Sequence, residues 1–244
     1  MDALRKVEGW PAGTAAVGVL RDGEEVAAHG LRERVFRWAS VTKPVTALAA
    51  LVAAEEGIVD LDQPAGPPGS TVRHLLAHAS GLPFDGDTPI AEPGRRRIYS
   101  NTGFEVLAET VAAAAEMPFA EYLAAAVLQP LGMNAELQCP RLVAPETWAE
   151  ATSVQFPGLD GVLPDIGRMS PNDWGLGVEL RDEKSPHWTG TRNSTRTFGH
   201  FGGSGTFVWV DPEPGVALAC LTDLDFGPWA LEAWPALSDA VLTT

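Results

Sequence analysis

The order of the predicted elements constrains the fold of this 244-residue chain more than any other feature. Apolar runs bounded by turn residues predict strands near both ends of the chain. These strands are expected at 15–20, 24–29, 198–210 and 215–222, and a last helix at about 229–242. Strands from the two ends can pair into one antiparallel sheet if the middle of the chain forms a helical insertion. The order therefore predicts an α+β fold.

The middle of the chain carries helical patterns and one irregular stretch. The spacing of Ala, Leu and Val predicts a helix from Ser40 to Glu56, ended by Gly57. Pro44 does not break this helix, because it lies in the first turn, where backbone N–H groups have no partner within the helix. The other expected segments are a short helix from the cap Ser70 or Thr71 to 80–81, helices at about 104–116 and 118–128, and an irregular stretch at 133–173.

Charge and apolar runs argue against two classes of partner. The net charge is -15, and an acidic surface repels the phosphate backbone of nucleic acids. The longest apolar stretch, 46–54, is far shorter than the ~20 residues that span a bilayer. The first residues contain no apolar run typical of a signal peptide. We therefore expect no nucleic-acid partner, no membrane association and a cytoplasmic protein, while the sequence assigns no oligomeric state.

The first pattern that carries chemistry is Ser40-Val41-Thr42-Lys43, at the predicted start of a helix. Positions i and i+3 share a helix face, so the hydroxyl and the amine can meet. Serine is a poor nucleophile without a nearby base. A lysine can be that base only if burial or a positive neighbour lowers its pKa. The alternative interpretation is an N-cap serine followed by a solvated lysine.

Two further patterns lie downstream. Tyr99-Ser100-Asn101 follows a loop and precedes a helix, and a tyrosine phenol can pass protons when cationic neighbours lower its pKa from about 10. The alternative is a loop tyrosine with an asparagine helix cap. The glycine-rich run 199–206 opens a strand, where glycines let a ligand approach the backbone closely. The alternative there is a flexible hairpin. Ser204 does not complete a G-x-S-x-G motif, because Thr206 stands in place of the last glycine.

Taken together and in this order, the three patterns resemble the motifs of the class C β-lactamase and D-alanyl-D-alanine carboxypeptidase superfamily. The segments 71–83, 129–133 and 205–212 are also similar to family segments. The resemblance implies a β-lactamase/transpeptidase-like fold and a single catalytic domain over 1–244. Its α/β part is expected at about 1–58 and 174–244, and its mainly helical insertion at about 59–173.

The resemblance also implies roles for the motif residues. Ser40 forms the acyl-enzyme, and Lys43 and Tyr99 share the proton transfer, with the identity of the base left open. Asn101 contacts the amide side of the substrate, and His200 stands where many relatives carry lysine. The N–H groups of Ser40 and Gly203 form the oxyanion hole. Gly202 belongs to the strand edge beside it that binds the substrate.

One departure from the family pattern bears on the substrate. Phe201 replaces a small hydroxylated residue that often helps bind a substrate carboxylate, and it is expected to make the site more apolar. We therefore expect hydrolysis of small esters or amides, with β-lactamase and D-amino-acid peptidase activity as competitors. The alternative function is a slow or inactive penicillin-binding-like protein that serves as a binding scaffold.

Other conspicuous residues carry less weight. His74 and His78 have the i, i+4 spacing of a helical metal pair, but no acidic residue lies between them and no third ligand is evident. We expect no metal and no cofactor. The run 95–97 is all arginine; it could steer an anion or lower the pKa of Tyr99, but a solvated loop is the preferred interpretation. Trp174 is expected either to line the cleft or to pack in the core.

Overall fold

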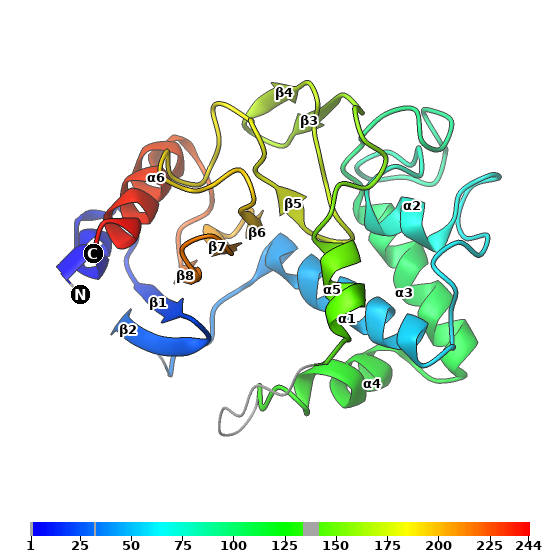
Figure 1. The fold of residues 1–244 in the computed structure, drawn as a ribbon, viewed down its shortest axis with the longest axis horizontal. Helices are drawn as coiled ribbons and strands as arrows, with labels where there is room; N and C mark the ends of the chain where they lie inside the picture. The colour runs from blue at the N-terminus through cyan, green and yellow to red at the C-terminus, as the bar shows by residue number, and fades with distance from the viewer. Residues whose placement is uncertain (1, 32, 134–141) are drawn as a thin grey trace. The chain divides into compact units, whose positions relative to one another are not determined.

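The computed structural model describes residues 2–31, 33–133 and 142–244, in two compact units. We call residues 1–42 and 179–244 the sheet unit, and residues 43–178 the helical unit. Figure 1 shows the elements of each unit along the chain.

The sheet unit is built on one antiparallel sheet of six strands in the order β2-β1-β8-β7-β6-β5. Its strands are β1 (Ala15–Arg21), β2 (Glu24–Gly30), β5 (Glu179–Leu180), β6 (Phe198–Gly202), β7 (Thr206–Asp211) and β8 (Val216–Thr222). Its helices are η1 (Asp2–Gly9), η2 (Ala39–Val41) and α6 (Pro228–Leu242). Strands from both ends of the chain pair through β1 and β8, which confirms the predicted α+β fold.

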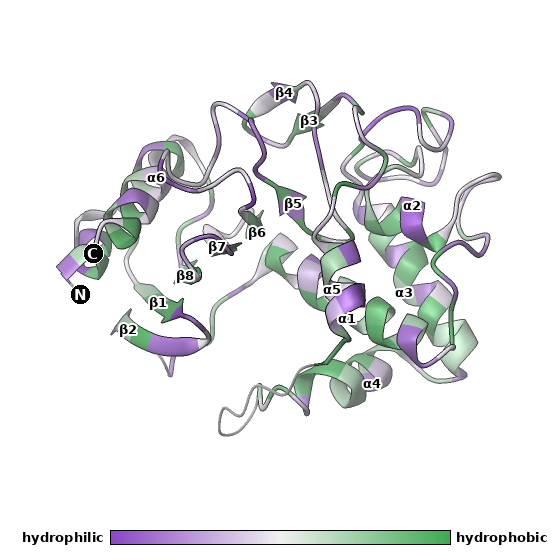
Figure 2. Cartoon of the chain, in the orientation of Figure 1, coloured by the Kyte–Doolittle hydropathy of each residue, from purple (hydrophilic) through white to green (hydrophobic). Residues whose placement is uncertain are grey.

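The core of the sheet unit follows from the alternation of side chains along its strands. Every second residue of β8 is buried, and α6 packs its aromatic face against β7. Trp209 on β7 donates its Nε1–H to Ser238 on α6 at 3.1 Å, and the rings of Phe207 and Trp234 lie 4.9 Å apart. The outer strand β2 is largely exposed and carries hydrophilic residues along much of its length (Figure 2).

One strand prediction was wrong. The expected strand 198–210 is a hairpin of β6 and β7, which pairs Phe201 with Phe207. The turn closes with a bond from the Gly205 N–H to the Gly202 carbonyl at 3.0 Å. Gly205 has a φ of +74°, and a Cβ there would lie 1.9 Å from the Leu224 oxygen. Only glycine fits such a position, so the glycine-rich run reverses the chain instead of extending a strand.

The helical unit holds most of the remaining elements. They are α1 (Thr42–Glu55), which starts at the boundary between the units, α2 (Val72–Leu76), α3 (Asn101–Ala115), α4 (Phe119–Leu123), the π-helical turn η3 (Ala124–Leu128), α5 (Pro145–Ala151), β3 (Gly161–Leu163) and β4 (Gly167–Met169). The small residues Ala49, Ala50 and Ala53 of α1 are fully buried. They belong to one apolar core with Leu107 and Val111 of α3.

Three boundaries between residues 40 and 173 differ from expectation. The helix predicted from Ser40 begins as the short turn η2 and becomes α-helical at Thr42. The short helix capped by Thr71 ends at Leu76, before 80–81. The stretch 133–173 contains α5 and the β3–β4 pair, although part of it, 134–141, lies outside the described residues. Within the described residues no single helix could span a membrane, whereas α3 and α4–η3 together, bent by 84°, have sufficient length and apolar character.

Candidate active site

In the helical unit the structure brings together Lys43, Tyr99 and Asn101. The Lys43 Nζ donates to the Asn101 Oδ1 at 2.7 Å, and it lies 4.9 Å from the centre of the Tyr99 ring and 5.7 Å from that of Phe104. Lys43 is only 9% exposed, so the alternative of a solvated lysine does not hold. Burial disfavours the charged form of an ammonium, whereas the faces of aromatic rings attract the cation.

Burial lowers the pKa of Lys43 to about 8, against the opposing effect of the carboxylates of Asp85 and Glu105. An amine with a pKa this close to neutrality exists in both protonation states under ordinary conditions. Lys43 therefore meets the condition for taking or holding a proton during catalysis. Its position at the second residue of α1 explains the burial, because the next turns of that helix run through the core.

The loop before α3 is held by hydrogen bonds of Ser100. The Ser100 Oγ accepts from the Gly103 N–H at 2.9 Å, which caps the helix, and donates to the Pro83 oxygen at 2.6 Å. The Ser100 N–H donates to the His78 Nδ1 at 3.1 Å. The helix cap is therefore Ser100, and Asn101 is the first residue of α3 with its side chain directed to Lys43.

Aromatic side chains surround Tyr99. Its ring centre lies 4.5 Å from that of His78, and 5.8 Å from those of Phe84 and of Trp174. Trp174 is almost fully buried, so of its two expected roles the structure shows packing. Together these rings restrict where the Tyr99 phenol can lie.

The run of three arginines at 95–97 divides into two environments. Arg95 and Arg96 are exposed, as a solvated loop requires, but Arg97 is only 2% exposed. Its guanidinium donates to four backbone oxygens, those of Ala77, Asn172 at 3.0 Å, Gln155 at 2.6 Å and Phe156 at 3.2 Å. For Arg97 the expectation of a solvated loop was therefore wrong.

Arg97 is a structural link that sequence reasoning missed. Burial lowers its pKa to about 10, against the opposing charge of Asp173, so the guanidinium remains charged at neutral pH. Because it joins separate loop segments two positions before Tyr99, it fixes the base of the loop that carries Tyr99 and Asn101. An arginine run in a loop gives no signal that one member is buried.

The two histidines considered as a metal pair have other contacts. His74 lies with its Nδ1 2.9 Å from the Thr71 Oγ1 and stacks on Phe156, with ring centres 4.3 Å apart. His78 accepts from Ser100 and packs against Tyr99. Within the described ranges no three His, Cys, Asp or Glu side chains are grouped as metal ligands would be.

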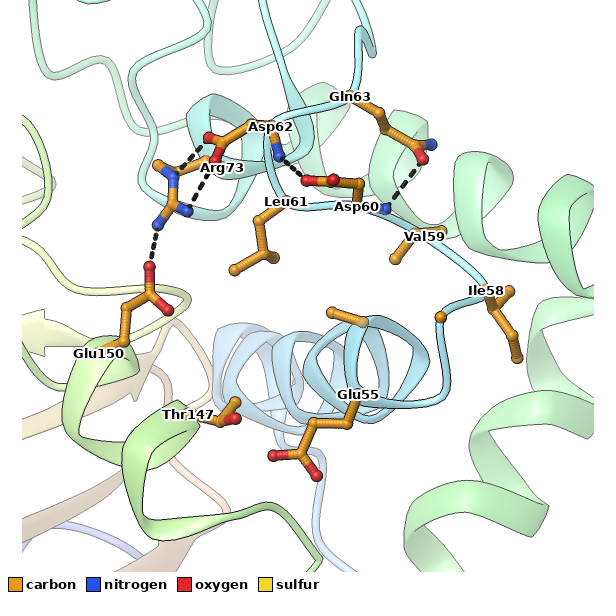
Figure 3. Close-up of a pocket in the computed structure, with 12 residues that line it drawn as sticks. Glu55, Ile58, Val59, Asp60, Leu61, Asp62, Gln63, Arg73, Thr147 and Glu150 are labelled. Carbon is orange, nitrogen blue, oxygen red and sulfur yellow. Dashed lines mark hydrogen bonds and ion pairs between the residues drawn. The ribbon is translucent and has the colours of Figure 1, made fainter.

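A separate pocket of about 620 Å³ in the helical unit contains none of the predicted site residues (Figure 3). At one edge of it, Arg73 on α2 bonds to Asp62 at 2.8 Å and to Glu150 on α5 at 2.6 Å (Figure 3). The hydrogen bond to Asp62 raises the pKa of Arg73 above its ordinary value. These bonds tie the segment before α2 to α5.

In the sheet unit, Ser40 lies in η2 beside the end of β6. A Cβ on Gly202 would lie 2.4 Å from the Trp38 oxygen and 3.2 Å from the Ser40 backbone nitrogen. Two hydroxyls hold this approach: Thr206 donates to the Trp38 oxygen at 2.9 Å, and Ser204 to the oxygen of Arg37 at 2.6 Å. Glycine at 202 is therefore required by the close approach of two backbones.

Gly203 lies at the start of the same hairpin turn. A Cβ there would meet nothing within 4 Å, and the Gly203 oxygen accepts from the Phe226 N–H at 2.9 Å. The structure thus places Gly202 and the Ser40 N–H side by side, with Gly203 next along the chain. The role of the Ser40 and Gly203 N–H groups as oxyanion donors stays a prediction.

His200 and Phe201 occupy opposite faces of β6, as successive strand residues do. His200 is buried, and its Nδ1 lies 2.6 Å from the Phe201 oxygen. Since a carbonyl only accepts, that nitrogen carries a hydrogen. The Phe201 ring packs 5.0 Å from Phe226 and 6.1 Å from Trp234. The ring is part of the core of the sheet unit. Phe201 therefore supplies no hydroxyl at this motif position, and its ring does not add an apolar surface to a substrate site.

A buried charged cluster beside β6 was also missed from the sequence. The carboxylate of Glu179 on β5 accepts from the Lys184 Nζ at 3.0 Å, from the Trp188 Nε1 at 2.6 Å and from the His187 Nε2 at 3.1 Å. Burial alone would raise the pKa of Glu179, but Lys184 and His187 together hold it below its ordinary value. The Trp188 ring of the cluster packs against Phe201 of β6, with ring centres 5.7 Å apart.

Comparison with known proteins shows one family to which the chain is similar. A model of the Beta-lactamase family matches residues 7–136, more than half of the chain. The chain is 32% identical to penicillin-binding protein 4* of Bacillus subtilis over 145 residues, which is 46% of this chain and 32% of that protein. It is 26% identical to the D-alanyl-D-alanine-carboxypeptidase/endopeptidase AmpH of Escherichia coli over 212 residues, 68% of this chain and 54% of that protein. The chain thus spans about a third to a half of these curated relatives.

Two solved structures superpose on nearly the whole chain. A β-lactamase from Mycobacterium bovis superposes with a TM-score of 0.96 and 53% identity, covering 99% of this chain and 98% of that one. A penicillin-binding protein homologue from Pyrococcus abyssi has a TM-score of 0.74 at 19% identity, covering 98% of this chain and 75% of that one. At that identity the likeness concerns the fold alone.

Proposed function

Since the chain belongs to the β-lactamase family, whose members point to serine hydrolase activity, we propose that it hydrolyses small esters or amides through an acyl-enzyme on Ser40. One observation carries the proposal. Three positions after Ser40, the Lys43 ammonium is buried, bonded to Asn101 and placed over the Tyr99 ring, with its pKa lowered to about 8. A serine hydroxyl needs a nearby base to lose its proton near neutral pH, and Lys43, three positions further along the chain, is the candidate for that base.

The proposed reaction has two halves. In the first, the Ser40 Oγ bonds to the carbonyl carbon of the substrate, and its proton passes to Lys43 or Tyr99. The N–H groups of Ser40 and Gly203 stabilise the oxyanion, each contributing about 2.7–4 kcal/mol at the transition state. The bond to the alcohol or amine then breaks, and the leaving group takes the proton. In the second half, water attacks the acyl carbon and gives one proton to the same base. The bond from that carbon to the Ser40 Oγ then breaks, the acid leaves, and Ser40 takes the proton back.

The substrate proposed here is a small ester or amide without an essential carboxylate. Phe201 supplies no hydroxyl to hold a carboxylate, because its ring packs in the sheet core. His200 remains the one polar side chain of the three-residue motif at β6. The names of the relatives make β-lactams and D-alanyl peptides the competing substrates.

Steady-state hydrolysis of a short p-nitrophenyl ester, measured beside a chromogenic cephalosporin, tests the substrate class. The proposal expects kcat/KM for the ester to exceed that for the cephalosporin. Efficient cephalosporin turnover with little ester turnover would contradict it. Turnover of neither compound, by protein that is folded, would favour the alternative of a binding scaffold.

The pH dependence of kcat/KM is expected to contain a rising limb near pH 8. Burial lowers the pKa of Lys43 to about 8, so the neutral amine that can accept the Ser40 proton becomes common as the pH passes this value. Lys43→Arg should abolish the limb and most activity, because a guanidinium stays charged. A falling limb at the same pH would instead assign Lys43 as an ammonium and Tyr99 as the base. A profile without a limb near pH 8 would remove Lys43 from the proton transfer.

A further inference from the structure

The side-chain amide of Asn101 is held from both ends. Its Oδ1 accepts from the Lys43 Nζ at 2.7 Å, and its Nδ2 donates to the Asp85 Oδ1 at 3.1 Å. If the amide were turned over, its NH₂ group would face the ammonium and its oxygen would face the carboxylate. Both contacts would then be repulsive, because Lys43 has only donors to offer and an ionised carboxylate has only acceptors. The pair of neighbours therefore determines which end of the amide meets Lys43.

The segment that carries Asp85 is fixed to the start of α3 rather than lying apart from it. Three bonds hold it, from the Ser100 Oγ to the Pro83 oxygen at 2.6 Å, from the Asn101 N–H to the Phe84 oxygen at 2.8 Å, and from the Gly86 N–H to the Thr102 Oγ1 at 3.1 Å. These bonds lie on both sides of Asp85 along the chain. The exposed Asp85 carboxylate is thus placed against Asn101 by the backbone around it.

We infer that Asp85 is a positioning residue for the hydrolysis proposed above, and this inference rests on that function. It fixes the Asn101 amide so that the amide oxygen holds the Lys43 ammonium in place. Asp85 accepts a hydrogen bond from the Asn101 Nδ2, so its positioning effect on Lys43 passes through Asn101. Neither the three motifs nor their spacing contains Asp85.

The charge of Asp85 also affects the pKa of Lys43, and this effect can be measured separately from the positioning. Two carboxylates of the helical unit, those of Asp85 and Glu105, raise the pKa of Lys43 against the effect of burial. The Asn101 amide and the rings of Tyr99 and Phe104 also face the ammonium. Removal of the Asp85 charge should therefore lower the pKa of Lys43, whichever protonation state of the lysine is the active one.

Three variants separate positioning from charge. Asp85→Ala removes both the acceptor and the charge. Asp85→Asn removes the charge but keeps an oxygen that can accept from the Asn101 Nδ2. Asp87→Asn is the matched control, because it removes a carboxylate from the same exposed segment without touching Asn101. Each is assayed with a short p-nitrophenyl ester from pH 6 to 10, and its melting temperature is measured.

The expected results differ for each variant. Asp85→Ala should lower kcat by about 10- to 100-fold with little change in KM, since a small misplacement of a catalytic group costs this much. Asp85→Asn should recover most of kcat, to within about threefold of the wild type. In both, the limb that reports Lys43 should move to lower pH, whereas Asp87→Asn should move it less and leave kcat unchanged.

Two results would overturn the inference. One is an Asp85→Ala variant that melts like the wild type and retains its kcat. The other is an Asp85→Asn variant that loses as much kcat as Asp85→Ala, which would leave charge alone as the cause. If the proposed function itself were wrong, the result would be different from both of these: ester hydrolysis would persist in the Ser40→Ala variant.

Discussion

Replacing Ser40 with alanine is expected to lower kcat/KM for a short ester by on the order of 10⁴-fold or more, since no acyl-enzyme can then form. The residual rate should exceed that in water, because the backbone N–H groups of the proposed oxyanion hole remain. Pre-steady-state measurements with the ester in excess over the protein would show the loss of the acylation burst directly. The variant should fold normally, since Ser40 is partly exposed on η2 and outside the apolar core.

Ser204 provides the matched control for this prediction. It is the other serine of the sheet unit close to the hairpin, and its Oγ donates to the Arg37 oxygen at 2.6 Å. Ser204→Ala should lose only the part of its activity that depends on this bond, less than about tenfold. A Ser204→Ala variant as inactive as Ser40→Ala, with Ser40→Ala retaining activity, would reverse the assignment of the nucleophile.

The second large effect concerns stability. Glu179→Ala is expected to lower the free energy of unfolding by about 3–5 kcal/mol, because it leaves the Lys184 ammonium buried without a counter-charge. The side chains of Glu179 and Lys184 are 1% and 2% exposed, and their charged atoms lie 3.0 Å apart. For a chain of this length the loss corresponds to a fall in melting temperature of roughly 10 °C. Differential scanning calorimetry measures it.

Two further variants show whether the loss comes from the unpaired charge. Combining Glu179→Gln with Lys184→Met removes both charges, and it should restore a large part of the stability that Glu179→Ala loses. Glu183→Ala, on the exposed side of the same segment, should change stability by less than about 0.5 kcal/mol. A double variant less stable than Glu179→Ala would contradict the account.

The direction in which the pKa of Glu179 is shifted determines how the stability from this cluster depends on pH. The pKa of Glu179 lies below its ordinary value of about 4.5 in the folded protein. The stabilisation by this carboxylate is therefore fully present at neutral pH, and it is lost as the pH falls below that ordinary value. The difference in stability between the wild type and the double variant should shrink in acid accordingly.

Local sequence patterns predicted most of the elements because those elements bury one regular face. The strands β1, β2 and β8 and the helices α1, α3 and α6 all appear where apolar periodicity places them. The resemblance to the β-lactamase superfamily was confirmed by the family model and by the solved structures. The hairpin at Gly205 was predicted only as the alternative interpretation of the glycine-rich run, because apolar residues continue on both sides of the turn and conceal the reversal.

Residues that act through tertiary contacts escaped sequence reasoning. Arg97, Glu179 and Asp85 are ordinary charged residues in the sequence, and their roles depend on partners distant along the chain. Arg97 bonds to oxygens as many as 75 positions away, and the Asn101 that Asp85 orients lies 16 positions from it. The periodicity of apolar residues and the spacing of motifs indicate local structure. Neither of these patterns identifies residues whose partners lie far away along the chain.

The claim that Ser40 is the nucleophile is tested most directly by covalent labelling. The protein is incubated with a fluorophosphonate probe and, separately, with a fluorescent penicillin, and the modified peptide is identified by mass spectrometry. We predict an adduct on the peptide that contains Ser40, absent from the Ser40→Ala variant. An adduct on another serine, or none with either reagent on folded protein, would contradict the proposed acyl-enzyme.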